Sequence, residues 1–245
     1  MSTTLPGRTG AALLGIGLAL VAPAYPQETV FQADYTVQTP GSAPNADVGA
    51  MEVWTGPPGE TPWGTGGILS LDGIPGSPKQ ALVLSDAQPG EGPVLHLNVP
   101  DFFTQTTPDL AGVVRIRFSV PVGGKYIGVI FMGGYWRDSA ATLRLADGKA
   151  QFFGVEEGND AFRDIARYET NQWIDLKVVF DFANNSYDAW WNGENVAKGV
   201  PWVSRASNEP WILIQADNSD FPRTGEPVLH VASAEVSLVK KSPLK

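Results

Sequence analysis

Cysteine is absent from the 245 residues of this chain. Its absence excludes disulfide bridges and thiolate metal sites, so the fold must be held together by burial of its core. The length is sufficient, because a chain of about 200 residues buries roughly 70% of the surface that its unfolded state exposes. No linker divides the sequence, and we therefore expect one domain over residues 25–245.

Basic residues are also scarce. The chain has 17 Lys and Arg against 26 Asp and Glu, which gives a formal net charge of -9 at pH 7. Nucleic acid requires a basic surface and anionic lipid attracts basic segments, so this composition argues against both as partners. It is compatible with ligands that are neutral or carry positive charge.

The longest apolar run extends only from Ala11 to Ala22. A transmembrane helix needs about 20 apolar residues, so we expect no membrane insertion. Arg8 precedes the run and Ala22-Pro23-Ala24 follows it, which is the arrangement of a signal peptide with a small-residue cleavage site. We therefore predict a signal peptide at residues 1–24 and a mature protein that is secreted or periplasmic.

Helical periodicity is almost missing as well. The 27 Gly and 20 Pro separate many short apolar runs, which is the pattern of an antiparallel sandwich or barrel. The one candidate helix, Asp160–Tyr168, could also be a loop, and Gly56–Gly67 is too rich in Pro and Gly for a strand. Strands are expected at Thr29–Val37, Met51–Trp54, Ile68–Leu71, Gln80–Leu84, Val94–Val99, Gly112–Val120, Tyr126–Met132, Ala141–Leu145, Ala150–Val155, Gln172–Phe182, Tyr187–Trp191, Trp211–Ala216 and Val228–Val239.

The segment from Asn171 to Trp202 carries the clearest strand pattern. Apolar residues alternate with polar ones from Ile174 to Phe182, which predicts a half-buried strand. Tyr187 to Trp191 follows after a polar turn, and Asn192-Gly193 then supplies the positive φ angles of a two-residue hairpin turn. A second hairpin is therefore expected immediately afterwards, and Asp147-Gly148 predicts another hairpin earlier in the chain.

Trp173, the alternation from Leu176 to Asp181, and Tyr187 to Gly193 together form a motif. This motif resembles one of the concanavalin A-like lectin/glucanase superfamily, which includes laminin-G-like domains. The resemblance implies a two-sheet antiparallel jelly-roll β-sandwich. Such a fold hosts lectins, glycan-cleaving enzymes and adhesion modules, so the fold alone does not settle the function.

Aromatic residues provide the first candidate binding sites. Trp190 and Trp191 cannot both face inward on a regular strand, so Trp190 becomes an exposed platform for a sugar ring, with Asp188 and Asn192 as hydrogen-bonding neighbours. Tyr135 and Trp136, at a Gly-rich strand end, form a second candidate. The alternative is that the tryptophans are structural, with Trp173, Trp191 and Trp211 in the core and the loop tryptophans over sheet edges.

Arginines provide another candidate. Arg115 and Arg117 alternate with apolar residues and must leave the sandwich on the same outer face, and Arg144 has the same setting on a later strand. If the three share one sheet, they form a cationic cleft suited to the carboxylate of an acidic sugar. Otherwise they are solvated charges paired with nearby acids.

Metal ligands are few. His96 and His230 are the only histidines, within a repeated Pro-Val-Leu-His, and could be paired ligands or ordinary strand residues. Three oxygen donors, Asp217, Asn218 and Asp220, fall close together in a presumed loop and could hold a structural calcium ion or form an Asx-turn.

Catalytic motifs are missing. Glucanases of the superfamily carry two Glu and an intervening Asp at fixed alternation on one strand, and no such pattern occurs here. We therefore expect a non-catalytic, lectin-like protein that binds an extracellular polysaccharide or glycan and requires no cofactor beyond a possible structural calcium. A polysaccharide-cleaving enzyme with an unrecognised motif and an adhesion module that binds protein are the alternatives. A binding module predicts exposed aromatic rings and neutral hydrogen-bonding groups, whereas an enzyme predicts a buried carboxylate with a displaced pKa.

Overall fold

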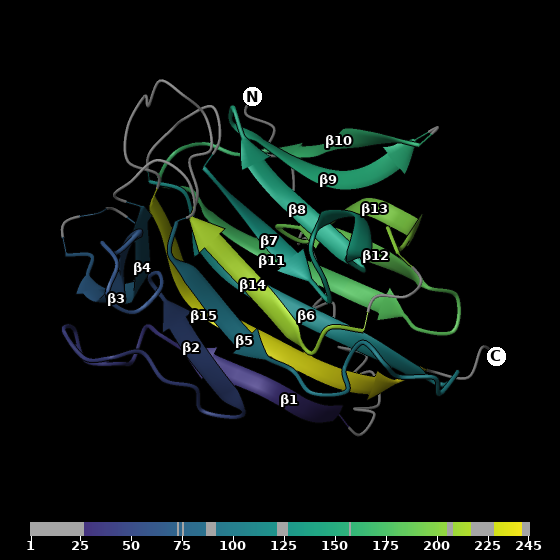
Figure 1. Ribbon diagram of the computed structural model, residues 1–245, viewed down its shortest axis with the longest axis horizontal. Helices are drawn as coiled ribbons and strands as arrows, with labels where there is room; N and C mark the ends of the chain where they lie inside the picture. The colour runs from purple at the N-terminus through teal and green to yellow at the C-terminus, as the bar shows by residue number, and fades with distance from the viewer. Residues whose placement is uncertain are drawn as a thin grey trace, which may run out of the picture.

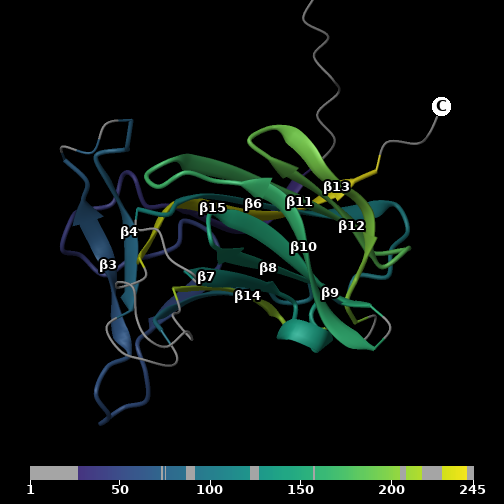
Figure 2. The same ribbon diagram turned by 90° about the horizontal axis from the view of Figure 1, so that it is seen from above.

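Two antiparallel β-sheets pack face to face in this protein, as the sequence predicts. The computed structural model describes residues 27–72, 74, 76–86, 92–121, 127–156, 158–204, 208–216 and 228–241. Figure 2 shows the sheets as stacked layers, with β6, β11 and β15 in one layer and β7, β8 and β14 in the other. The fold is therefore a jelly-roll β-sandwich, and the predicted all-β class is confirmed.

The larger sheet has eight strands. Its order is β13-β12-β11-β6-β15-β4-β3, and β1 pairs with β15 beside this path. The strands are β1 (Gln27–Asp34), β3 (Gly64–Ser70), β4 (Gln80–Asp86), β6 (Leu110–Ser119), β11 (Trp173–Asp181), β12 (Ser186–Trp191), β13 (Glu194–Pro201) and β15 (Val228–Lys240).

The smaller sheet has seven strands in the order β10-β9-β8-β7-β14-β5-β2, and it lies in front of the larger sheet in Figure 1. The strands are β2 (Ala50–Trp54), β5 (Val94–Asn98), β7 (Gly128–Met132), β8 (Ala141–Ala146), β9 (Lys149–Glu156), β10 (Asn159–Arg167) and β14 (Trp211–Ala216). A single helical turn, η1 (Trp136–Asp138), connects β7 to β8 within the described residues. No helix in the described ranges is long and apolar enough to cross a membrane.

The main core lies between the sheets and confirms the predicted alternation. Ile174, Leu176, Val178 and Phe180 on β11 are all buried, while Asp175 between them is exposed. Trp191 on β12 is buried against Phe118 at 5.9 Å between ring centroids. Trp190 points outward, as expected for the neighbouring strand position.

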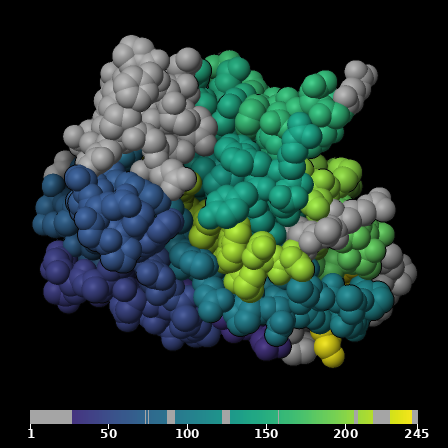
Figure 3. Space-filling view, viewed as in Figure 1, coloured from purple at the N-terminus to yellow at the C-terminus, as the bar shows by residue number. Residues whose placement is uncertain are grey.

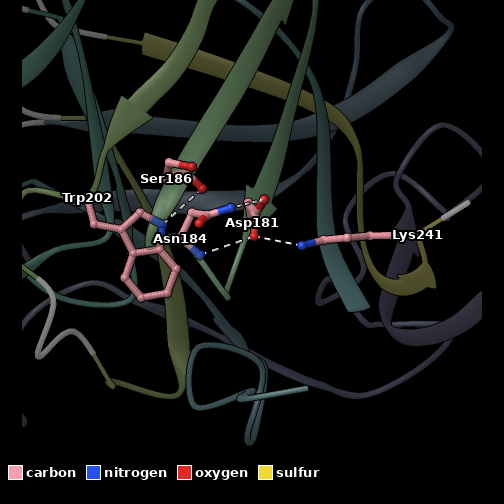
Figure 4. Close-up of polar contacts among 5 residues, drawn as sticks. All are labelled: Asp181, Asn184, Ser186, Trp202 and Lys241. Atoms are coloured by element: carbon pink, nitrogen blue, oxygen red, sulfur yellow. Dashed lines mark hydrogen bonds and ion pairs between the residues drawn. The ribbon is translucent and has the colours of Figure 1, made fainter. Parts of the chain in front are cut away.

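The predicted hairpins are also present. Asn192 and Gly193 have φ angles of 51° and 85°, and β13 follows them as the expected second hairpin. The turn between β11 and β12 is stabilised by Asp181, whose Oδ1 lies 2.7 Å from Lys241 Nζ and whose Oδ2 accepts a hydrogen bond of 2.9 Å from Asn184 Nδ2 (Figure 4). The carboxylate thus joins the turn to the residue that follows β15.

An aromatic cluster closes one end of the sandwich. Phe102, in the bend between β5 and β6, is fully buried and contacts Phe103, Phe180 and Phe182 at 4.9, 6.1 and 5.5 Å between ring centroids. Gly112 on β6 leaves room for this packing, because a Cβ atom there would lie 2.5 Å from Phe102 Cζ. The chain between β5 and β6 therefore contributes to the core although it is not a strand.

Two segments differ from the sequence prediction. The expected helix or loop at Asp160–Tyr168 is wrong, because residues 159–167 form β10, paired with β9. A register shift between Asp164 and Ala166 interrupts the alternation of β10, which explains why its apolar spacing resembles that of a helix. The expected loop at Gly56–Gly67 is partly wrong, since β3 begins at Gly64 and pairs with β4.

Candidate functional site

The predicted site residues divide between the outer faces of the two sheets. The eight-stranded sheet carries Arg115, Arg117, Asp188, Trp190 and Asn192 on or beside its outer face, and the seven-stranded sheet carries Tyr135, Trp136 and Arg144. The hypothesis of one cleft shared by three arginines is therefore wrong. The prediction fails because β6 and β8 belong to different sheets, so that Arg144 points away from Arg115 and Arg117.

The outer face of the eight-stranded sheet holds a groove of about 730 Å³. We call it the charged groove, and its main side chains are Arg115, Arg117, Asp175, Lys177, Trp190 and Glu235. Strand register explains their convergence, because Trp190 lies opposite Lys177, Lys177 opposite Arg115, and Arg115 opposite Glu235. Side chains in such a row stand next to one another on the same face of a sheet.

Most charges in the charged groove are paired with one another. Arg115 Nη1 lies 3.2 Å from Glu235 Oε1, and Arg117 Nε lies 3.7 Å from Asp175 Oδ1. The alternative prediction, in which these two arginines pair with nearby acids, is therefore confirmed. The Lys177 ammonium group lies 4.5 Å from the centroid of the Trp190 ring, so a sugar must compete with this cation for that position.

Asp188 and Asn192 are both engaged in the hairpins. Asp188 Oδ1 accepts a hydrogen bond of 2.6 Å from the backbone nitrogen of Gly199. Asn192 Oδ1 accepts one of 2.9 Å from the backbone nitrogen of Asp175. These contacts give both side chains a structural role, and their role in sugar binding stays a prediction.

The outer face of the seven-stranded sheet is different in character, because aromatic rings cross it. We call this run the aromatic band, and its rings, in order of contact, are Phe162, Phe153, Trp136, Phe131, Tyr135, Trp211 and His96. Neighbouring rings have centroids between 4.7 and 6.3 Å apart. Figure 3 views the molecule from this side, where β14 (yellow-green) is part of the surface.

Within the aromatic band, the rings form a layer over buried apolar residues. Val129, Phe131 and Leu213 point outward from β7 and β14 yet are buried, in a cluster separate from the main core. The ring of Tyr135 packs on Phe131 at 5.0 Å and on Trp211 at 4.7 Å between ring centroids, and the residue remains 53% exposed. A ring that is supported from below and exposed above is suited to stack against a flat apolar ligand surface.

The backbone around η1 fixes the position of these rings. Gly133 and Gly134 have φ angles of 72° and 148°, which allows the chain to turn sharply after β7. Arg137 Nη2 forms an ion pair of 2.7 Å with Asp160 Oδ1, which ties η1 to β10. Tyr135 and Trp136 are thus held in place before any ligand arrives, which lowers the entropic cost of binding.

Polar groups accompany the aromatic band. Arg144 stacks on Phe162, with its guanidinium carbon 3.4 Å from the ring centroid, and donates hydrogen bonds to Gln151 Oε1. Gln215 lies in the same cross-strand row, because it pairs with Val129, which pairs with Arg144. The surface therefore combines rings with hydrogen-bonding side chains, as a binding module requires.

Sequence reasoning missed part of this surface. The alternative that placed Trp211 and Trp173 in the core is wrong, because Trp211 lies half-buried on the outer face of β14 and Trp173 lies half-buried outside the main core. A usable signal was present in β7, because every residue from Gly128 to Met132 is apolar or Gly and all are buried. A strand that is apolar on both sides indicates that its outer face is also covered.

The two histidines lie on different sheets, so they do not form a shared site. His96 on β5 contacts Trp211 at 6.3 Å between ring centroids, and His230 on β15 contacts Trp173 at 6.4 Å. Within the described ranges, no group of three or more His, Cys, Asp or Glu residues could hold a metal ion. The predicted calcium ligands Asp217, Asn218 and Asp220 and the predicted signal peptide at residues 1–24 lie outside the described residues.

Burial of His230 gives folding stability a pH dependence. The side chain is only 7% exposed, and burial lowers its pKa from 6.5. A lowered pKa means that the unfolded chain binds a proton more readily, so His230 destabilises the fold as the pH falls below 6.5. We expect His230→Gln to reduce the loss of unfolding free energy between pH 7.5 and 5.5, measured by urea denaturation. An equal loss in both proteins would contradict this assignment.

The architecture and its two outer surfaces place the chain among β-sandwich proteins. No protein-family model and no curated protein sequence matches it. Solved structures with a similar fold include a carbohydrate esterase of the Shiga toxin-encoding bacteriophage phi24B, with 13% identity, a TM-score of 0.58, and coverage of 89% of this chain and 100% of the esterase chain.

Botulinum neurotoxins provide further structural neighbours. One is a structure of botulinum neurotoxin type C, whose cell entry depends on interaction with two ganglioside molecules, with 9% identity and a TM-score of 0.57. Another is the binding domain of botulinum neurotoxin DC in complex with rat synaptotagmin II, with 9% identity and a TM-score of 0.55. Both matches cover 89% of this chain and 49% of the neurotoxin chain, so this protein spans about half their length. At these identities, the similarity shows the fold alone.

Proposed function

We propose that this protein is an exported, lectin-like member of the concanavalin A-like class and that the aromatic band binds an extracellular glycan. The observation that carries the proposal is the layer of seven contacting rings, from Phe162 to His96, on an outer sheet face. Tyr135 is the most accessible residue of the band, because it is 53% exposed. Sugar rings present flat apolar faces of the kind that such rings stack against.

Neutral hydrogen-bonding groups next to the rings support a binding role. Gln215 lies on the same face and can hydrogen-bond a hydroxyl group, whereas the amide of Gln151 is already engaged by Arg144 and Asp164. Asp164, which accepts a hydrogen bond from Gln151, has a lowered pKa, first because of its hydrogen bond from Lys149 and then because of the one from Gln151. A general acid for glycan cleavage needs a raised pKa, so Asp164 is unsuited to that role.

The structural neighbours support the same proposal at the level of the fold. A carbohydrate esterase and a neurotoxin that depends on gangliosides share the sandwich, so this architecture is used where glycans are recognised. Trp190 in the charged groove stays a second candidate platform, although Lys177 lies against its ring.

Affinity electrophoresis in gels containing neutral and acidic polysaccharides tests the proposal. We expect at least one polysaccharide to retard the protein, and the double variant Tyr135→Ala/Trp211→Ala to weaken that binding by about 10- to 100-fold, since each lost stacking contact costs about 1 kcal/mol or more. Tyr135→Phe keeps the ring and should bind nearly normally.

Trp190→Ala provides the matched control on the opposite sheet. Unchanged binding in this variant, together with loss in the double variant, assigns the glycan to the aromatic band. The reverse result would move the site to the charged groove. No retardation by any polysaccharide would overturn glycan binding and favour an adhesion module that binds protein.

A further inference from the structure

Arg144 is held in a way that suggests a specific ligand group. Its guanidinium plane lies against Phe162, with 3.4 Å between Cζ and the ring centroid. Its Nε and Nη2 atoms both donate to Gln151 Oε1, at 3.0 and 2.6 Å. The ring fixes the plane of the guanidinium group and the amide fixes its rotation, so the cation is oriented in advance.

A network behind Gln151 holds this arrangement. Gln151 Nε2 donates a hydrogen bond of 2.6 Å to Asp164 Oδ1, and Lys149 Nζ lies 2.7 Å from Asp164 Oδ2. The Asp164 carboxylate therefore connects to Arg144 only through a neutral amide and is itself paired with a lysine. Among the residues that the structure describes, the positive charge of Arg144 is thus positioned without a carboxylate that pairs with it directly.

Three other arginines on the two outer faces are paired directly with carboxylates. Arg115, Arg117 and Arg137 each lie within 3.7 Å of a carboxylate oxygen. Across the ranges that the structure describes, no ion pair involves Arg144. Burying part of a cation without an acid partner is unfavourable, and an anion of a ligand that paired with the cation would reduce this cost.

The edge of the guanidinium group that Gln151 does not occupy is complementary to a carboxylate. Gln151 occupies the edge formed by Nε and Nη2, which leaves Nη1 and the outer hydrogen of Nη2 as two parallel donors that form no hydrogen bond with any residue the structure describes. This fork matches the two oxygens of a carboxylate. Phe162, on which Arg144 lies, contacts Trp136 at 6.0 Å between ring centroids, so the fork lies at one end of the aromatic band.

We infer that Arg144 binds the carboxylate of a sugar residue while the rings of the aromatic band stack on neighbouring residues of the same glycan. The ligand class is therefore an acidic polysaccharide that contains uronic acid. The net charge of -9 by itself favours neutral or positively charged ligands, so this inference rests on the local cation of Arg144 and not on the charge of the whole chain. This inference rests on the proposed glycan-binding function and adds to it the chemical class of the ligand.

The test compares acidic polymers with their carboxyl-reduced forms. Alginate and polygalacturonate are used as probes in affinity electrophoresis, each beside the same polymer after reduction of its carboxyl groups. We expect the wild-type protein to bind at least one native polymer about tenfold more tightly than its reduced form, because a charge-assisted hydrogen bond contributes about 1.5–3 kcal/mol. Arg144→Gln should bring that ratio close to one.

Two further variants test whether the preference depends on the two parallel donors of Arg144 or only on positive charge. Arg144→Lys keeps the charge without the two parallel donors and should recover only part of the preference. Arg115→Gln removes a cation from the opposite sheet and should keep the full preference. Near-UV circular dichroism of each variant checks that its fold is unchanged.

The outcomes distinguish this inference from the proposed function. If native and reduced polymers bind equally, or if Arg144→Gln keeps the wild-type ratio, the acidic ligand class is wrong while glycan binding stands. If neither form of any polymer binds, and neutral polysaccharides also fail, the glycan-binding proposal is overturned and this inference with it.

Discussion

Replacing Trp191 with alanine is expected to lower the free energy of unfolding by about 3–5 kcal/mol, whereas Trp190→Ala should lower it by only about 1 kcal/mol. The two tryptophans are adjacent on β12 but face opposite sides of the sheet. Trp191 is 5% exposed and packs against Phe118, so its removal leaves a cavity in the main core. Trp190 loses mainly its contact with Lys177.

This pair tests the face assignment directly, because the residue type, the substitution and the strand are the same. Urea denaturation followed by far-UV circular dichroism measures both values without relying on tryptophan fluorescence. Equal losses in the two variants would mean that β12 is twisted or shifted in register, and the outward position of Trp190 would then be wrong.

Phe102→Ala should cost about 3–5 kcal/mol as well, although Phe102 lies in a bend rather than in a strand. Its ring is fully buried and contacts Phe103, Phe180 and Phe182. Thr106→Ala, an exposed change in the same connection, is the control and should alter stability by less than about 0.5 kcal/mol. Comparable small losses in both variants would show that the bend does not close the core.

Gly112 offers a second measurement of the same cluster. In the wild type, Gly112→Ala places a Cβ atom 2.5 Å from Phe102 Cζ and 2.6 Å from Phe182 Cζ, so the rings must move. In a protein that already carries Phe102→Ala, part of that space is free and the additional loss should be smaller. Additive losses in this double-mutant cycle would contradict the contact.

Local pattern was sufficient to predict most of the strands and the hairpins that follow them. The alternation from Ile174 to Phe182 and the Asn192-Gly193 turn depend only on neighbouring residues, and both are confirmed. β10 was mistaken for a helix or loop because its bulge between Asp164 and Ala166 is a response to pairing with β9. Bulges of this kind depend on the partner strand, so the spacing of apolar residues in the bulged strand alone does not distinguish a strand from a helix.

The grouping of site residues was harder to predict than their exposure. Arg115, Arg117 and Arg144 were correctly expected to point outward, but the sheet to which each belongs depends on pairings between distant strands. β6 pairs with β11 and β15, whereas β8 pairs with β7 and β9. A period-two pattern gives the side of a strand and contains no information about its neighbours.

The rings that make up the aromatic band were also hard to predict from the sequence. The Gly-rich setting made Tyr135 and Trp136 candidates, but their ring neighbours come from β7, β9, β10 and β14. The sequence around Trp211 is equally compatible with a core position and with a position in an outer aromatic layer, because an apolar residue on a strand can face either. Only the packing of distant segments separates these two settings.

The position of β1 has a mechanical consequence. Gln27 at the start of β1 lies opposite Val239 near the end of β15, and the two strands run antiparallel. A load that pulls these two ends apart acts across the strands, so the ladder between them opens one hydrogen bond after another instead of shearing as a whole. β1 should therefore peel away at low force, while the remaining strands of its sheet stay paired.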